Sequence, residues 1–303
     1  MRFHFLLKTI SVALIAFAIF SVAAMKTSAD SPTPTPTPRS SAPQNPRTIY
    51  YVYLPLIQSN PASAAPLKKG VPLTYPDCAI VTAVNASWEY AWGPTPPDCP
   101  GVENIPMIWD SSEINYTLGG NSQWIMGFNE PDSASQANMS PAQAAAGWRQ
   151  IEQKYPTRKL LAPAPSGANA SWIVDFRNAY ISAYGTAPRM DGLDVHCYRW
   201  YASECTDHTQ NFITWANSWN VPEVWVTEFS FSPTSPSSPA RSLQEAQTFI
   251  TWMENNPKIT RFAWFASKIQ GNEWWLPPTH NTPLVNWTTG LPTTYGAMYL
   301  PFR

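Results

Sequence analysis

Eight short apolar runs alternate with polar or helix-forming stretches between Lys68 and Phe265. This alternation is typical of repeated strand-helix units, which build a sheet of parallel strands. Eight units predict an α/β fold, a (β/α)8 TIM barrel, and the segment 68–303 lies at the small end of the usual size for that fold. The predicted strands are Lys69–Leu73, Ala86–Ala91, Asn104–Trp109, Trp124–Asn129, Lys159–Ala162, Gly192–His196, Glu223–Thr227 and Arg261–Phe265.

Four helices have clear signals in the sequence. Ser140, Pro141 and Gln143 supply an N-cap, a proline at the first helical position and a capping-box partner, which predicts a helix from Pro141 to about Lys154. Prolines crowd the region between the second and third strands, so the barrel should be short, with some abbreviated helices. The other three helices are expected at Ser171–Tyr184, His208–Asn220 and Ser242–Asn255.

The N-terminal 29 residues have the pattern of a secretory signal peptide, with Arg2 and Lys8 ahead of an apolar stretch that ends in small residues. That stretch is too short to span a membrane comfortably, and an uncleaved anchor is the alternative. Residues 30–67 read as a Pro/Thr/Ser-rich linker containing one strand-like run, Ile49–Ile57, to which no role is assigned. We therefore expect a secreted or cell-surface protein without other membrane contact.

The charge of the chain limits the kinds of partner that it can bind. Only 13% of the residues are charged, the net charge is −1, and no basic stripe occurs, which argues against a nucleic-acid partner. We expect a monomer.

The four cysteines of an exported chain are expected to form disulfides. Proximity in the sequence favours Cys78 with Cys99 and Cys197 with Cys205 among three possible pairings.

Two glutamates end predicted strands, Glu130 in WIMGFNEPD and Glu228 in VWVTEFSF. They lie 98 positions apart, about three times the ~30 residues of one strand-helix-strand step. This spacing places them on the fourth and seventh strands, at the C-terminal mouth where such barrels keep their chemistry. Facing carboxylates indicate glycoside hydrolysis, with Glu130 as acid/base and Glu228 as nucleophile of a double displacement.

Other residues at the predicted mouth are candidates for contacts with a sugar. Asn129 precedes Glu130, and His196 and Tyr198 share one face of the sixth strand. Tryptophan rings stack on the apolar faces of sugars, although about half of the strand-end aromatics should belong to the core. The tryptophans assigned to substrate binding are Trp88, Trp109 and Trp264, of which Trp264 is expected to form the floor under the cleaved sugar.

No metal or organic cofactor is expected. A zinc site built from His196, Cys197, Cys205 and His208 is an alternative, but the close-spaced ligand pairs of structural zinc sites are missing. The chain also lacks a G-x-S-x-G elbow and an H-E-x-x-H run.

The motifs GFNEPD, VWVTEF and RFAWF, with the closing LVNWTTGLPTTYGAMYL, resemble glycoside hydrolase family 128, the hydrolases with an alkali-sensitive-linkage-protein-like catalytic core. The resemblance extends over about Lys68 to Leu300. It implies a retaining β-1,3-glucanase with Glu130 as acid/base and Glu228 as nucleophile, although Cys197 stands where an aromatic residue is expected. The expected function is endo-acting hydrolysis of a polysaccharide or oligosaccharide. The alternatives are a retaining hydrolase of xylan, mannan or mixed-linkage glucan, and a non-catalytic glycan-binding protein.

Overall fold

The computed structural model describes residues 67–271, 273, 276 and 280–303, all within one compact unit that extends from Asn60 to Arg303. The predicted signal peptide, the linker and the run Ile49–Ile57 lie outside the described residues. None of the helices in the described part is long and apolar enough to cross a membrane.

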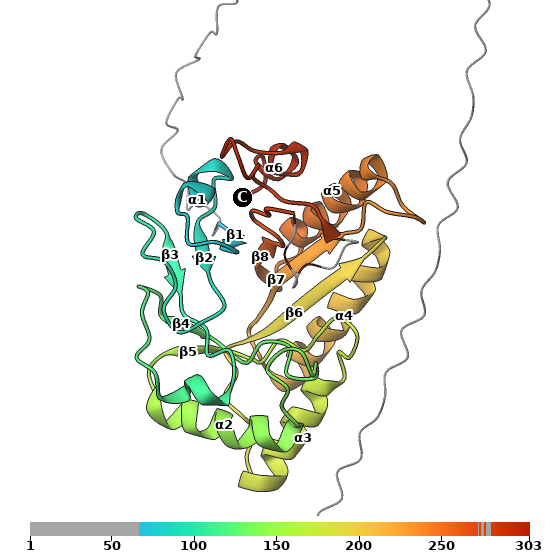
Figure 1. The fold of residues 1–303 in the computed structure, drawn as a ribbon. Helices are drawn as coiled ribbons and strands as arrows, with labels where there is room; N and C mark the ends of the chain where they lie inside the picture. The colour runs from blue at the N-terminus through green and yellow to red at the C-terminus, as the bar shows by residue number, and fades with distance from the viewer. Residues whose placement is uncertain (1–66, 272, 274–275, 277–279) are drawn as a thin grey trace, which may run out of the picture. The chain divides into compact units, whose positions relative to one another are not determined.

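Eight parallel strands form the sheet, as the sequence predicts (Figure 1). The strand order is β3-β2-β1-β8-β7-β6-β5-β4. The edge strands β3 and β4 approach each other through a parallel bridge between Met107 and Met126, which nearly closes the barrel. The strands are β1 (Lys69–Pro72), β2 (Trp88–Tyr90), β3 (Glu103–Ile105), β4 (Trp124–Met126), β5 (Lys159–Leu161), β6 (Gly192–Arg199), β7 (Glu223–Phe231) and β8 (Ile259–Trp264).

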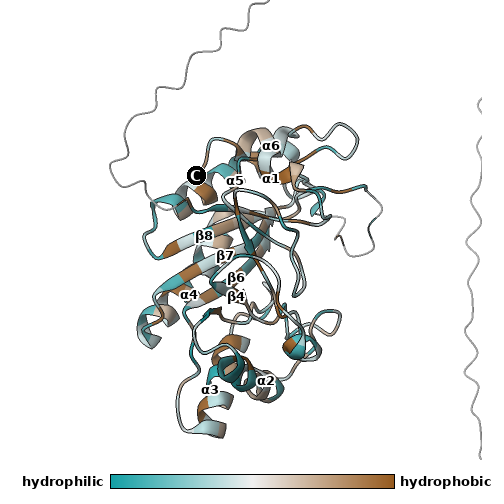
Figure 2. Ribbon diagram, turned by 90° about the vertical axis from the view of Figure 1, so that its left-hand side faces the viewer, coloured by the Kyte–Doolittle hydropathy of each residue, from teal (hydrophilic) through white to brown (hydrophobic). Residues whose placement is uncertain are grey.

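Side chains separate into an inner and an outer apolar cluster because successive residues of a strand point to opposite faces. The inner cluster fills the barrel with large rings, among them Trp88, Trp124 and Trp225. The outer cluster joins residues such as Val224 and Phe262 to the helices. Figure 2 shows the resulting bands of hydrophobic residues on β6, β7 and β8.

The long helices follow strands β4 to β7, and α2 packs against α3 (Figure 1). The predicted capping box of α2 is present, with the Ser140 hydroxyl accepting from the Gln143 N–H. Helix α4 begins six residues earlier than predicted, because Glu204 and Glu245 accept the N–H groups of Tyr201 and Ala202. The helices are α2 (Pro141–Lys154), α3 (Trp172–Tyr184), α4 (Ala202–Trp219), α5 (Pro239–Asn255) and α6 (Thr294–Tyr299).

The connections among the first strands are abbreviated, as expected. Only the five-residue α1 (Ala79–Ala83) separates β1 from β2, and a 3-10 helix, η1 (Ser111–Asn115), lies between β3 and β4. The disulfide between Cys78 and Cys99 ties α1 to the loop before β3. The second predicted pair, Cys197 with Cys205, is also bonded and ties β6 to α4.

Glu89 is a buried carboxyl on the outer face of β2, between the inward-facing Trp88 and Tyr90. Its side chain is fully covered, and neither carboxyl oxygen has a hydrogen-bond partner among the described residues. Burial raises the pKa of Glu89 from 4.5 to about 8, so this carboxyl is largely neutral at pH 7.

Glu89 should therefore make stability depend on pH. Because the pKa is higher in the folded chain, the full stability is present below pH 4.5 and declines as pH rises towards about 8. Glu89→Gln should remove this decline and raise the free energy of unfolding at pH 8 by roughly 4 kcal/mol. Urea unfolding at pH 4.5 and pH 8 measures the difference. Asp98→Asn, at an exposed carboxyl of the same region, is the matched control, and an equal pH dependence of Glu89→Gln and wild type would contradict the buried neutral carboxyl.

Candidate active site

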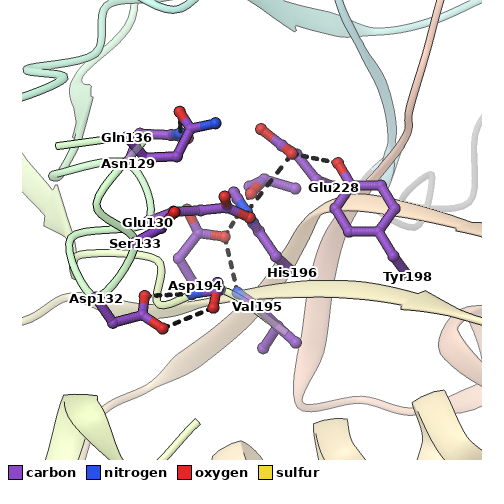
Figure 3. A network of polar contacts seen from close by, with 12 residues as sticks. Asn129, Glu130, Asp132, Ser133, Gln136, Asp194, Val195, His196, Tyr198 and Glu228 are labelled. Atoms are coloured by element: carbon purple, nitrogen blue, oxygen red, sulfur yellow. Dashed lines mark hydrogen bonds and ion pairs between the residues drawn. The ribbon is translucent and has the colours of Figure 1, made fainter. Parts of the chain in front are cut away.

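Glu130 lies just beyond the C-terminal end of β4, in a turn that holds its backbone firmly. Its φ of +42° lies in the left-handed region, which costs a non-glycine residue about 1 kcal/mol or more. Its N–H donates to the Ala164 carbonyl at 2.8 Å, so β4 and β5 remain linked past their ends. Asp132 secures the same turn by accepting from both the N–H and the hydroxyl of Ser166, at 2.7 and 2.6 Å (Figure 3). These bonds fix the direction of the Glu130 side chain.

Glu228 is on β7, buried, and surrounded by hydrogen-bond donors. The Trp92 indole N–H donates to Glu228 Oε1 at 2.8 Å, and the Tyr90 hydroxyl lies 3.4 Å from the same oxygen. The Tyr198 hydroxyl donates to Oε2 (Figure 3). Burial raises the pKa of Glu228, whereas the His196 charge and the Tyr198 and Trp92 bonds oppose that rise. The donors favour the ionised form of a carboxylate that has been removed from water.

His196 lies between the two carboxylates at the mouth end of β6 (Figure 3). Its Nδ1 is 3.0 Å from Glu130 Oε1 and 3.5 Å from Glu228 Oε2, and the ring is completely buried. Burial lowers the pKa of His196, but the two glutamates outweigh burial and raise that pKa to about 9. At neutral pH the imidazolium therefore balances part of their negative charge.

Asp194 lies two residues before His196, on the same inner face of β6. Its Oδ1 accepts from the Thr227 hydroxyl at 2.6 Å and from the Val195 N–H at 2.9 Å. Burial raises the pKa of Asp194 to about 7, against the opposing charge of His196. Strand β6 thus adds a third carboxyl, a buried one, to the two glutamates, and the sequence analysis did not identify it.

Asn129 and Trp109, two of the predicted substrate-binding residues, lie next to Glu130. Asn129 is buried, donates its amide to Gln136 Oε1 at 3.2 Å, and keeps an Oδ1 with no partner among the described residues. Its N–H donates to the Trp109 carbonyl at 3.0 Å, so the half-buried Trp109 is a neighbour of the site. A role for Trp109 and Asn129 in substrate binding stays a prediction.

Two predicted sugar platforms are wrong. Trp264 is fully buried on the outer face of β8, packed against Phe229 and Tyr295, with its N–H donated to the Thr282 carbonyl. Strand alternation instead turns the next residue, Phe265, towards the mouth. Trp88 is equally buried, in the inner cluster that fills the barrel, and its indole donates to the Lys68 carbonyl.

Phe265 belongs to an aromatic wall beside Glu228. Its ring meets Trp92 and Tyr198 edge to face, with centroids 5.8 and 5.6 Å apart. His280 stacks on Tyr198 at 5.2 Å. The sequence analysis assigned no role to Trp92. The overlooked signal is the spacing Trp88, Tyr90, Trp92. Alternate residues of a strand share a face, so the three rings lie in line along the inner face of β2 and just beyond its end.

Glu130, His196 and Glu228 present three possible ligand atoms within 4.8 Å of one another, a geometry that could hold a cation. The Glu228 oxygens already accept from Trp92 and Tyr198, which is the environment of a carboxylate stabilised by hydrogen bonds. The alternative zinc set loses both sulfur ligands because Cys197 and Cys205 form a disulfide.

Solved structures resemble the fold over most of the chain. A family 128 subgroup I endo-β-1,3-glucanase from Amycolatopsis mediterranei, crystallised with laminaripentaose, is 26% identical with a TM-score of 0.62, covering 78% of this chain and 99% of that one. A subgroup II endo-β-1,3-glucanase from Pseudomonas viridiflava is 25% identical with a TM-score of 0.62, covering 78% and 98%. One from Sorangium cellulosum, 22% identical with a TM-score of 0.63 over 78% and 98%, supports the fold alone.

Sequence comparison gives the family. Alkali-sensitive linkage protein 1 of Schizosaccharomyces pombe (strain 972) is 24% identical over 212 residues, which is 65% of this chain but only 37% of that longer protein. The model of the family described as glycosyl hydrolase catalytic core matches residues 74–299, which include both glutamates and every strand from β2 to β8. The chain therefore belongs to the glycosyl hydrolase catalytic core family and is a glycoside hydrolase of the family 128 type.

Proposed function

We propose that the protein is a secreted, retaining endo-β-1,3-glucanase. The observation that carries the mechanism is the closeness of the catalytic pair, because carboxylate oxygens of Glu130 and Glu228 lie within 4.8 Å of each other. Retaining glycosidases hold their carboxyl groups about 5–5.5 Å apart, whereas inverting enzymes need about 6.5–9.5 Å to admit a water.

In the first step, Glu228 attacks the anomeric carbon as the bond from that carbon to the leaving oxygen breaks. Glu130, in its protonated form, gives its proton to that oxygen. Glu130 suits this role because its side chain is more exposed than that of Glu228, at 15% against 6%. The leaving sugar departs with the proton, and the remaining sugar is an ester of Glu228.

In the second step, Glu130 takes a proton from a water molecule, whose oxygen attacks the same carbon and frees Glu228. His196 bonds to Glu130 and faces Glu228, so its positive charge stabilises whichever of the two carboxylates is ionised at each step. Tyr198 and Trp92 donate hydrogen bonds to Glu228 and stabilise it whenever it is ionised.

The substrate is inferred from relatives. Structures at least 25% identical include β-1,3-glucanases described in complex with laminaripentaose or laminarihexaose. The aromatic wall of Trp92, Phe265 and Tyr198 offers the apolar surface that a glucose ring stacks on. Xylan, mannan and mixed-linkage glucan are the competing substrates, to be assayed beside β-1,3-glucan by release of reducing sugar. Chain-internal cleavage is read from the size of the first products.

The two disulfide bonds support secretion. Cys78–Cys99 and Cys197–Cys205 are both bonded, and stable disulfides form chiefly in oxidising compartments outside the cytosol. The predicted signal peptide fits the same interpretation. Intact mass of the protein recovered from its native host would identify the mature N-terminus.

Loss of the nucleophile should abolish turnover. Glu228→Gln keeps the shape and the hydrogen-bond acceptor but cannot form the ester, so kcat on β-1,3-glucan should fall by about 10⁴-fold or more. Binding of laminari-oligosaccharides, measured by calorimetry, should survive. Glu223→Gln, at the opposite end of the same strand, is the matched control and should keep wild-type activity. A fully active Glu228→Gln would refute the mechanism, and wild-type binding without turnover on any of the four glycans would indicate a binding protein.

The stereochemistry of the first product tests the carboxylate separation directly. Double displacement should release the β-anomer first, and proton NMR during the first minutes of hydrolysis distinguishes it from the α-anomer. Early α-anomer would indicate inversion.

Removal of the His196 charge should change the pH profile. The charge of His196 lowers the pKa of Glu228, so His196→Asn should raise that pKa and move the acidic limb of kcat/KM upward by about one unit. His208→Asn is the control, because burial lowers the pKa of His208 to about 4 and leaves it neutral. If the two variants have the same acidic limb as wild type, His196 does not set the charge of the site.

A further inference from the structure

Strand β7 reverses the direction of its side chains just before Glu228. Val224 and Val226 pack in the outer cluster, and so do Phe229 and Phe231. Outward positions are therefore even-numbered before residue 227 and odd-numbered after it. A regular strand repeats every two residues and cannot change in this way, so one extra residue must be accommodated.

Both neighbouring strands identify the same irregularity. Towards β6, Val226 is opposite Val195 while Glu228 is already opposite the next residue, His196, so that Thr227 has no partner of its own. Towards β8, the register also shifts between Val226 and Phe229. Two residues of one strand opposite one of its neighbour define a β-bulge, with Thr227 as the extra residue.

The bulge gives Glu228 its direction. In an unbroken strand the alternation of Val224 and Val226 would continue to position 228 and turn Glu228 outward, towards the helices. With the extra residue, Glu228 faces the interior, where it meets His196 and Tyr198.

Thr227 is fully buried, and its hydroxyl and its carbonyl are both hydrogen-bonded. Its hydroxyl donates to Asp194 Oδ1 at 2.6 Å. Its carbonyl accepts from the Tyr90 hydroxyl at 3.1 Å, although a parallel ladder would normally pair such a group with a neighbouring strand. Asp194 and Tyr90 are themselves almost completely buried, on β6 and β2.

We propose that Asp194 and Tyr90 are positioning residues that clamp the Thr227 bulge and thereby aim Glu228 at the reacting carbon. This assignment rests on the proposed hydrolytic function of Glu228. Stability alone does not explain the clamp, because an apolar side chain at each position would avoid the cost of burying a carboxyl and a hydroxyl. Trp225, which is opposite Asp194 in the register of β6 and β7, packs in that apolar way with Trp88 and Trp124.

The test removes one hydroxyl. Thr227→Val keeps the shape of the side chain and loses the bond to Asp194, so the bulge should relax and misplace Glu228. A displacement of about 1 Å can cost on the order of 10²-fold in rate, and we expect kcat to fall by about 10- to 100-fold with KM changed less than about threefold. Thr227→Ser restores the hydroxyl and should recover kcat to within about threefold of wild type.

The matched control is Thr209→Val. Thr209 is also a fully buried threonine, on α4, but its hydroxyl has no hydrogen-bond partner within the described part of the chain. It should leave kcat and KM unchanged. Circular dichroism and thermal unfolding establish that each variant is folded. If Thr227→Val does not fold, Asp194→Asn and Asp194→Ala replace it, and the asparagine, which keeps an acceptor oxygen, should retain at least tenfold more activity than the alanine.

The outcomes separate the two proposals. If the wild type hydrolyses none of the four glycans, the proposed function fails, and the clamp is then judged by a crystal structure of Thr227→Val (or of Asp194→Ala). Loss of the contacts from Tyr198 and Trp92 to Glu228 in that structure supports the clamp, and unchanged contacts overturn it. If the wild type is active, equal kcat in Thr227→Val, Thr227→Ser and wild type overturns the clamp while leaving the function intact.

Discussion

The close approach of two glutamates at the mouth of the barrel is the constraint on which the site depends. Burial of Glu228 and the nearby charge of Glu130 both raise the pKa of Glu228 and favour its protonation. Glu228 nevertheless has to be available as an anion. His196 resolves the conflict because one nitrogen lies within 3.5 Å of both side chains, and its pKa is raised to about 9 by the charges it balances.

The same constraint accounts for the aromatic character of the mouth. Trp92 and Tyr198 bring hydrogen-bond donors to Glu228 without adding a charge, and the Tyr90 hydroxyl lies 3.4 Å from it. Their rings also exclude water and pack against Phe265 and one another. A lysine or arginine in their place would neutralise Glu228 and weaken it in its proposed role as nucleophile, whereas neutral donors orient it and leave its negative charge available.

Features encoded over a few neighbouring residues were readable from the sequence. The eight strands follow from short apolar runs, the start of α2 follows from Ser140 and Gln143, and the glutamate pair follows from strand spacing. The error at Trp264 came from choosing the larger ring instead of following the alternation of β8, in which Ala263 faces the interior and Trp264 does not.

Long-range features were harder to predict, for a physical reason. The exchange from Val224 and Val226 to Phe229 and Phe231 marks the bulge in β7, and careful attention to parity could have found it. By contrast, Tyr90 is 137 positions from Thr227, and Asp132 is 34 positions from Ser166. Such pairs are created only when the barrel closes, so a single sequence contains no local signal for them.

Both glutamates of the proposed catalytic pair depart from regular secondary structure, and in each case the surrounding barrel supplies the restraint. Glu130 adopts a left-handed backbone conformation and Glu228 follows a bulge. Irregular backbone of this kind is unfavourable by itself and persists only when neighbouring groups determine it. The restraining groups are side chains of adjacent loops and strands: Ser166 holds Asp132 in the Glu130 turn, and Asp194 holds Thr227 before Glu228. The two carboxylates are thus oriented by polar contacts of neighbouring residues, and the apolar framework of the barrel shields these contacts from water.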